Sequence, residues 1–291
     1  MDFLSYLISG LGLGSVYAII ALGYTMVYGI AKMLNFAHGD VIMIGAYVAF
    51  FALSGAGLPL PVATLLAVLV CTVLGVVIER LAYKPLRQAS ALSVLITAIG
   101  VSYFLQNAAQ LVWSSSTKVF PAVIQNGGLS VGGLTVSYLT LLTIGVCILV
   151  MVGLTLFINY TRTGRAMRAC SEDKGASTLM GINVNSMISI TFAIGSGLAA
   201  IASVLLCAAY PSVYPTLGAM PGIKAFTAAV FGGIGSIPGA FLGGILLGVI
   251  EILAKAYIST QLSDAIVFAV LILVLLIKPT GLLGKRIREK V

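Results

Sequence analysis

Side chains that could do chemistry are scarce in this 291-residue sequence. One histidine and eight acidic residues cannot assemble a catalytic triad or paired carboxylates, so we expect no enzymatic activity. We also expect no metal site, because His38 has no second ligand at a suitable spacing. The sequence contains no GxxxxGK[ST] phosphate loop, so any use of ATP would need another chain. We therefore expect no cofactor here, and look to polar groups that could bind rather than react.

The first such group is the run Asn35-Phe36-Ala37-His38-Gly39-Asp40. Asn35 and Asp40 could cap helix ends, and Gly39 could adopt the positive φ of a sharp turn. One interpretation is a broken-helix element that lines a translocation pathway. The other is an elbow at the membrane interface whose polar groups satisfy loose backbone. The residue types alone favour the elbow.

The second group is an amide and hydroxyl stripe in an apolar stretch. Ser102, Gln106 and Gln110 recur at i, i+4 and i+8, and Asn107 lies beside them. Polar groups are costly in lipid, so this face must point into a helix bundle or an aqueous path. Amides and hydroxyls suit a zwitterionic or neutral solute, but interhelical hydrogen bonds are their commoner use.

Glu251 is a third candidate, because it is a carboxylate inside an apolar run. Lys255 follows four residues later, and an ion pair on one helix face would neutralise both groups. A proton relay is the alternative for Glu251, but relays usually need more ionisable groups.

The fourth group is the segment 161–185, which is long and polar. Its residue types favour one or two short amphipathic helices, with Ser171 as a possible cap and Gly181 as a stop. A plain connection would not need such signals, so the segment predicts a docking site for a cytoplasmic partner. The candidate docking residues are Arg165, Arg168, Glu172, Asp173, Gly175 and Gly181.

The elements that position these groups must be membrane spans. The composition is 60% hydrophobic and 8% charged, whereas soluble domains carry roughly 25% charged residues. A span needs about 20 apolar residues. Runs of suitable length are Phe3–Ile30, Phe36–Leu53, Leu60–Ile78, Ala91–Trp113, Tyr138–Tyr160, Met187–Tyr210 and Pro238–Tyr257, with Asp264–Ile277 as a shorter one. Residues 223–235 predict a short discontinuous helix.

The fold class is therefore all-α: a polytopic transmembrane bundle of about eight to nine spans in one domain over residues 1–291. Basic residues cluster at 80–87, at 162–174 and in the tail 278–291, and the positive-inside rule places these clusters in the cytoplasm. With nine spans the N-terminus lies outside and the C-terminus inside. The net charge of +8 then reports orientation in the membrane, and no nucleic acid partner is expected.

An internal echo bears on the symmetry of the bundle. Residues 77–82, VIERLA, resemble residues 249–254, VIEILA, and nine spans would orient the two helices oppositely. An inverted repeat would produce this arrangement. Coincidence is the other interpretation, since the chain is rich in Val, Ile, Leu and Ala.

Longer strings carry a resemblance to a known family. They are YTMVYGI (24–30), LNFAHGD (34–40), IER (78–80), YKPLR (83–87), AIG (98–100), FLQN (104–107), GRA (164–166), KAFTAAV (224–230), GGIGSIPGA (232–240) and KPTG (278–281). In these strings the chain resembles the permease subunits of high-affinity branched-chain amino acid ABC importers, most of all the smaller, H-type permease.

The resemblance implies a bacterial cytoplasmic-membrane transporter for leucine, isoleucine and valine. It implies a second related permease, two cytoplasmic ATPase subunits and an extracytoplasmic substrate-binding protein as partners, besides membrane lipid. It also implies that residues 161–185 are the coupling segment, and it shifts the interpretation of Asn35–Asp40 towards function. Urea and short-amide importers share much of this pattern and remain the alternative, with a stand-alone secondary transporter behind them.

Overall fold

The structure is a computed structural model that describes residues 2–123, 127–131 and 134–284. Its membrane-length helices are α1 (Asp2–Ala31), α3 (Leu60–Ile78), α4 (Ala91–Trp113), α5 (Tyr138–Tyr160), α8 (Val184–Ala209) and α10 (Ile237–Tyr257). The shorter helices are α2 (His38–Ser54), α6 (Arg162–Glu172), α7 (Lys174–Leu179), α9 (Ala219–Gly232) and α11 (Ser263–Ile277). After α3 the chain continues as a π-turn, η1 (Glu79–Tyr83), and a 3₁₀ turn, η2 (Lys84–Leu86). The predicted basic tail 278–291 is described only to residue 284, and its last seven residues lie outside the described ranges.

The structure confirms a polytopic helical bundle but changes the span count. Six helices of the described chain are long and apolar enough to cross a membrane, rather than eight or nine. The larger number is reached only when α2, α9 and α11 are counted, which have 17, 14 and 15 residues. At 1.5 Å per residue each is shorter than a hydrocarbon core of about 30 Å.

Local signals explain where several helices begin. The Oγ of Ser90 accepts a hydrogen bond from the backbone N–H of Ser93, which caps α4 at 3.2 Å. Asn183 and Ser236 cap α8 and α10 in the same manner. Pro238 occupies the first turn of α10, where its missing N–H costs no hydrogen bond.

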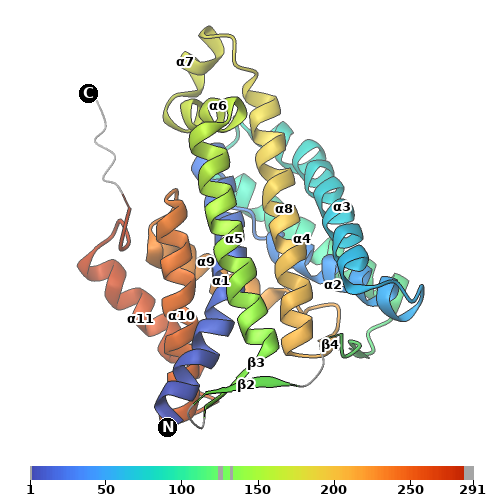
Figure 1. Ribbon diagram of the computed structural model, residues 1–291. Helices are drawn as coiled ribbons and strands as arrows, with labels where there is room; N and C mark the ends of the chain where they lie inside the picture. The colour runs from blue at the N-terminus through green and yellow to red at the C-terminus, as the bar shows by residue number, and fades with distance from the viewer. Residues whose placement is uncertain (1, 124–126, 132–133, 285–291) are drawn as a thin grey trace.

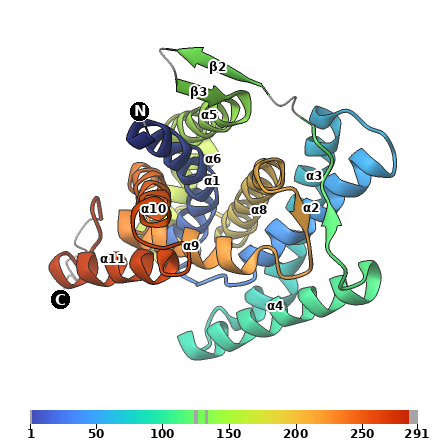
Figure 2. The same cartoon turned by 90° about the horizontal axis from the view of Figure 1, so that it is seen from below.

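Helix α1 is the centre of the bundle and contacts α5, α8, α9 and α10, whereas α4 and α11 lie at the periphery (Figure 2). Its closest neighbour is α10. A Cβ added to Gly14 would lie 2.8 Å from the Cα of Ile245, and one added to Gly10 would lie 2.8 Å from the Cα of Val249. Small residues therefore let these two backbones approach, which is how helices associate in lipid.

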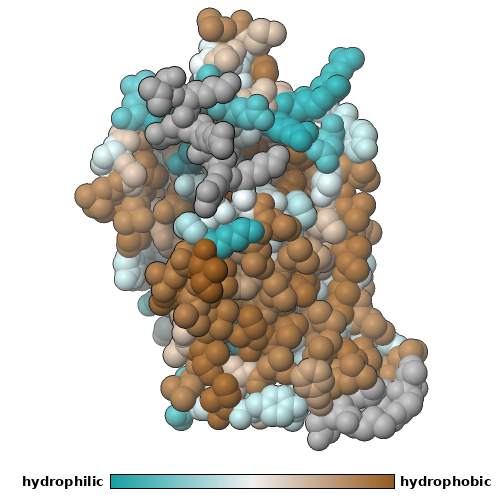
Figure 3. Space-filling view, turned by 90° about the vertical axis from the view of Figure 1, so that its left-hand side faces the viewer, coloured by the Kyte–Doolittle hydropathy of each residue, from teal (hydrophilic) through white to brown (hydrophobic). Residues whose placement is uncertain are grey.

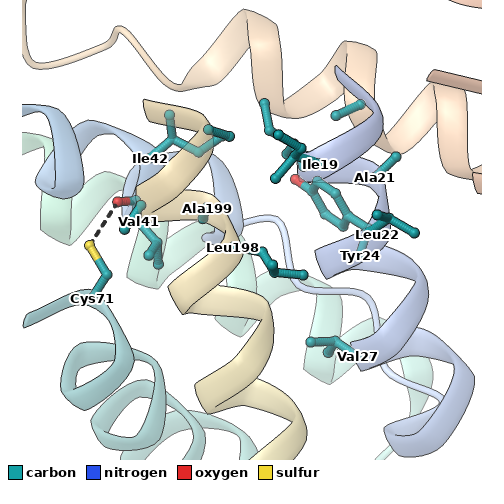
Figure 4. Close-up of a cluster of buried hydrophobic side chains, with 14 of the residues drawn as sticks. Ile19, Ala21, Leu22, Tyr24, Val27, Val41, Ile42, Cys71, Leu198 and Ala199 are labelled. Carbon is teal, nitrogen blue, oxygen red and sulfur yellow. Dashed lines mark hydrogen bonds between the residues drawn. The ribbon is translucent and has the colours of Figure 1, made fainter. Parts of the chain in front are cut away.

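The hydrophobic core continues between α1, α2, α3 and α8. Figure 4 shows Ile19 and Val27 on the side of α1 that faces α8, with Leu198 of α8 and Val41 of α2 beside them. The thiol of Cys71 faces the carbonyl oxygen of Val41 at 3.5 Å, and all four cysteines of the chain are free and buried.

The two ends of the bundle differ. The N-terminus lies at one end, together with two short antiparallel sheets that the all-α expectation did not include (Figure 1). These sheets pair β1 (Lys118–Val119) with β4 (Ser212–Val213), and β2 (Gly128–Val131) with β3 (Leu134–Ser137). Helices α6 and α7 lie at the opposite end. The chain crosses from β4 through α9 to the start of α10, as the discontinuous helix predicted at 223–235 requires.

The outer surface fits a membrane. Apolar side chains cover the middle and lower part of the face in Figure 3, while hydrophilic ones gather at its upper end. Large apolar side chains on α3, α4 and α5 are exposed, among them Leu69, Leu111 and Leu149. The composition and this surface together make the chain a multi-pass membrane protein.

Candidate functional site

The segment Asn35–Asp40 is a buried junction between the end of α1 and the start of α2. Asn35 accepts a hydrogen bond on its Oδ1 from the hydroxyl of Tyr83 at 2.9 Å. Gly39 packs on α9 so closely that an added Cβ would lie 2.6 Å from the carbonyl oxygen of Gly218. Neither Asn35 nor Asp40 caps α2, whose N-cap is Ala37 without a side-chain hydrogen bond. The segment therefore joins α2 to η1 and α9.

Asp40 connects this junction to α4. The Nε2 of Gln106 donates to Asp40 Oδ1 at 2.9 Å, and the same amide lies 3.2 Å from the Oγ of Ser102. Asp40 is buried, and its carboxylate has no ion pair within the described residues. Two residues of the amide and hydroxyl stripe, Ser102 and Gln106, thus face α2.

The remaining polar residues of α4 do not join them. Asn107 and Gln110 are exposed, and the Nδ2 of Asn107 donates to the carbonyl of Tyr103 within the same helix at 2.7 Å. The i, i+4, i+8 spacing therefore predicts one face correctly only as far as Gln106.

His38 is buried against the aromatic ring of Tyr24, with ring centroids 4.6 Å apart and an edge-on arrangement. Its Nε2 has no hydrogen-bond partner within the described part of the chain. An added Cβ at Gly23 would lie 2.7 Å from this Nε2, so α1 needs a glycine there. His38, in the first turn of α2, therefore packs directly against α1.

The space beside Asn35 is small. A cavity of about 10 Å³ is enclosed by residues of α1, the 33–35 segment and α9, including Tyr28, Met33, Phe226 and Ile234. A single water needs roughly this volume, and an amino acid needs far more. At this point the junction is closed.

Glu251 lies away from that junction, in a separate ion cluster. Its Oε1 is 2.9 Å from the Nζ of Lys224 on α9 and 2.6 Å from the Nζ of Lys255, and Tyr17 of α1 donates to its Oε2 at 2.9 Å. Lys224 also pairs with Asp264 of α11 at 2.7 Å. The predicted Lys255 partner is confirmed, while Lys224 and Tyr17 carried no signal in the local sequence.

A third buried carboxylate, Glu79, was not among the candidate residues of the sequence analysis. It pairs with Arg87 and accepts a hydrogen bond from the hydroxyl of Ser189 on α8 at 2.6 Å. Arg87 also donates to Asn185, so η1, η2 and the start of α8 form one polar cluster. The sequence did offer one signal for Glu79, because it occupies the same place in VIERLA as Glu251 does in VIEILA.

Residues 161–185 form two helices, as predicted, and then lead into α8. The hydroxyl of Thr161 caps α6, and the Oδ1 of Asp173 caps α7 by accepting from Ala176 at 2.9 Å. Ser171 is not the cap, because its hydroxyl instead donates to the carbonyl of Arg168. Gly181 has φ +80° just after α7, which confirms the predicted helix stop.

The surface of this segment is open. The charged groups Arg165, Arg168, Glu172 and Asp173 are exposed, as is Gly175 in the first turn of α7. Leu179 and Met180 at the tip are 89% and 82% exposed. Apolar residues rimmed by charges in this way mark interaction surfaces.

Lys174 ties the segment to the bundle. Its Nζ donates to the carbonyl oxygen of Ala31, at the end of α1, over 2.8 Å. Burial, together with the neighbouring Arg87 and Lys32, lowers the pKa of Lys174. A displacement of α7 would therefore act directly on the central helix.

Residues 6–275 match the family described as "Branched-chain amino acid transport system / permease component". The chain belongs to this family. A relative in Pseudomonas aeruginosa, "High-affinity branched-chain amino acid transport system permease protein BraD", is 50% identical over 99% of this chain and 98% of its own length. The LivH permease protein of Escherichia coli K12 is 47% identical over the same shares.

Two further similarities are more distant. The LsrD protein of an autoinducer 2 import system in Escherichia coli is 27% identical over 93% of this chain and 83% of its own. Among solved structures, PsaBC from Streptococcus pneumoniae in complex with Fab has a TM-score of 0.50 at 16% identity, covering 94% of this chain and 92% of that one. At this identity the likeness concerns the fold alone.

Proposed function

We propose that this branched-chain permease family member is the transmembrane subunit of an ATP-driven importer of leucine, isoleucine and valine. The observation that carries the proposal is the 50% identity, over nearly both whole chains, to a relative named a high-affinity branched-chain amino acid permease. An extracytoplasmic binding protein delivers the solute in this proposal. A second related permease and two ATPase subunits complete the transporter, because this chain contains no phosphate loop.

The α6–α7 segment is the proposed coupling element. Its exposed apolar side chains, Leu179 and Met180, would insert into a groove of an ATPase subunit. Lys174 links α7 to the end of α1, and α1 packs on α10 along glycines. Closure of the ATPases would move α7, and α1 would carry this movement to the junction at Asn35–Asp40.

The proposed pathway follows the junction and its polar neighbour on α4. Asn35, His38, Asp40 and Gln106 line it, and the small cavity beside Asn35 supports a closed state in which no solute fits. Asn107 and Gln110, exposed at membrane depth on α4, face the second permease, since amides are costly against lipid. Glu251 lies apart, with its charge matched by lysines, and we assign it to helix packing.

The proposed orientation puts the α6–α7 end in the cytoplasm of a bacterial inner membrane. This end carries most of the basic residues: Lys32, the 80–87 cluster and the 162–174 cluster. Lys118 lies at the opposite end of the bundle, where the N-terminus is. A cysteine in place of Lys118 should react with an impermeant reagent from outside, and one in place of Arg165 only from inside. The reverse pattern would contradict the orientation.

Solute competition tests the function. Proteoliposomes containing the whole transporter and its binding protein should accumulate labelled leucine, and unlabelled isoleucine or valine should compete, while excess urea should not. The alternative, a urea or short-amide importer, predicts uptake of labelled urea and none of leucine. That result would overturn the assignment of the solute and leave the permease class standing.

Charge reversal tests the coupling surface. Glu172→Lys with Asp173→Lys should reduce ATPase association and uptake while the chain still inserts. Because Asp173→Lys also removes the side-chain cap of α7, Glu172→Gln with Asp173→Ala is the matched control: it loses the same cap without reversing the charge, and should keep more ATPase association and uptake. Wild-type uptake in the reversed variant would refute docking at this segment.

A further inference from the structure

A polar cleft of about 650 Å³ opens on the bundle surface between the end of α3 and the start of α8, at the end that carries α6 and α7. It is distinct from the Asn35–Asp40 junction and from the exposed tip of α7. Its polar lining consists of Arg80, Lys84, Asn183, Asn185, Ser186 and Ser189. Nothing in the proposed transport cycle uses this cleft.

The cleft carries positive charge without a counter-ion. Arg80 and Lys84 lie four residues apart on η1 and η2, and both are exposed. Across the described residues neither side chain forms an ion pair or a hydrogen bond. Arg87 behaves differently, because Glu79 and Asn185 occupy its guanidinium group. Two cations are therefore left to face the cleft, which favours an anionic ligand.

Hydrogen-bond donors on α8 add to this preference. The Oδ1 of Asn183 accepts from the backbone of Ser186, and the Oδ1 of Asn185 accepts from Arg87. Each amide consequently has its NH₂ group left to donate. The N-terminus of α8, a helix of 26 residues, also points its partial positive charge at this region. Guanidinium, ammonium and amide donors together are suited to phosphate oxygens.

The inner wall of the cleft is apolar. Val76, Ile190 and Ala193 line it, and the exposed side chains of Val73 and Val77 continue the apolar surface along α3. Arg80 is the second residue after the apolar helix Leu60–Ile78, and the end of a membrane-length apolar helix is where lipid headgroups are expected. A ligand that fills this site therefore has an anionic head and a long apolar body.

We propose that the cleft binds the phosphate headgroup of an anionic phospholipid, with its acyl chains along the exposed apolar face of α3. Basic pockets between transmembrane helices bind such headgroups in other membrane proteins. The bound lipid would brace α8 where it leaves the α7 turn, because Asn183 caps α8 and Asn185 contacts Arg87. Lipid occupancy would thus stiffen the base of the coupling segment. The inference holds whatever solute the transporter carries.

Native mass spectrometry of the detergent-purified transporter tests it. Phosphatidylglycerol and phosphatidylcholine with identical acyl chains are titrated separately. In Arg80→Gln with Lys84→Gln, the apparent affinity for phosphatidylglycerol should fall about tenfold or more, since each basic residue near such a headgroup contributes appreciably. Phosphatidylcholine binding should stay unchanged. Arg80→Lys with Lys84→Arg should retain wild-type phosphatidylglycerol binding.

The matched control is Lys32→Gln with Arg162→Gln, which removes two exposed cations from the same end but outside the cleft. This control should bind phosphatidylglycerol as the wild type does. Lys84→Gln alone should give an intermediate loss of phosphatidylglycerol affinity. Because Lys84 is exposed, this variant should fold normally, so it keeps the test valid if the double variant misfolds. Undiminished phosphatidylglycerol binding in the double variant would overturn the proposal. Loss of an ATPase subunit with unchanged lipid binding would also overturn it, by assigning the cleft to a protein partner.

Discussion

Glu79 and Glu251 stand at the same position of two similar strings, yet the chain neutralises them in different ways. Both are buried, with 0% and 1% of their side chains exposed. Each has a cation and a hydroxyl group as partners. Glu79 finds them on Arg87 and Ser189, close to the α6–α7 end.

Glu251 instead gathers partners from two other helices, besides Lys255 of its own helix. Lys224 comes from α9 and Tyr17 from α1, and Lys224 extends the cluster to Asp264 on α11. Helices α3 and α10 run in opposite directions, because α3 leads to the contact of Arg87 with Asn185 while Tyr257, ending α10, contacts Tyr6. The directions agree with the expectation from the echo. The buried carboxylate thus joins the turn after α3 to one helix, α8, in the first string and belongs to a cluster of four helices in the second.

Removing the carboxylate of Glu251 should have the largest effect. Glu251→Gln leaves Lys224 and Lys255 without their shared partner in a buried site, which costs about 3–5 kcal/mol in free energy of unfolding. The midpoint temperature of unfolding in detergent measures this loss. Glu172→Gln, the same change at an exposed position, should leave the midpoint near the wild-type value.

A second substitution sharpens this result. Lys224→Gln added to Glu251→Gln removes one uncompensated charge and should recover part of the lost stability. Additive losses in the double variant would mean that the two residues do not act as a pair.

Glu79→Gln should have a smaller effect, of about 1–3 kcal/mol. Glutamine can still accept from Ser189, and Arg87, with 15% of its side chain exposed, keeps Asn185 and gains access to water. The same thermal measurement gives the comparison. A loss equal to that of Glu251→Gln would mean that the Glu79 cluster, which reaches only α8, stabilises the fold as much as the four-helix cluster of Glu251.

Asp264→Asn should have the smallest effect of the three. The side chain of Asp264 is 43% exposed, so solvent screens its pairing with Lys224, which keeps Glu251. We expect a shift in midpoint temperature close to that of the exposed control. A large shift would show that α11 depends on this ion pair for its position.

The sequence predicts the helices well, because each span is an apolar run whose length the bilayer dictates. The predicted run Ala91–Trp113 is α4 to the residue, and Tyr138–Tyr160 is α5. Apolar runs do not reveal how long the shorter helices α2, α9 and α11 are. Their ends depend on packing against neighbouring elements. Two-residue strands such as β1 and β4 leave no pattern to detect.

The candidate site shows the same limit. Lys255 was predictable for Glu251 because it lies one helical turn away, but Tyr17 is 234 residues distant in the chain. Spacing identified the polar face of α4, but only the packing on α2 separates Gln106, which contacts Asp40, from the exposed Gln110. Partners that come from other helices depend on tertiary contacts, and the spacing of residues within one helix does not encode these contacts.

The dependence of leucine accumulation on ATP and on the ATPase subunits tests the account most directly. Proteoliposomes containing this chain, the second permease and the ATPases should concentrate labelled leucine when binding protein is outside and ATP is supplied to the ATPases. Vesicles without the ATPases, or with a non-hydrolysable ATP analogue, should not concentrate it. Accumulation by the permease chains alone, driven by an ion gradient, would contradict the account.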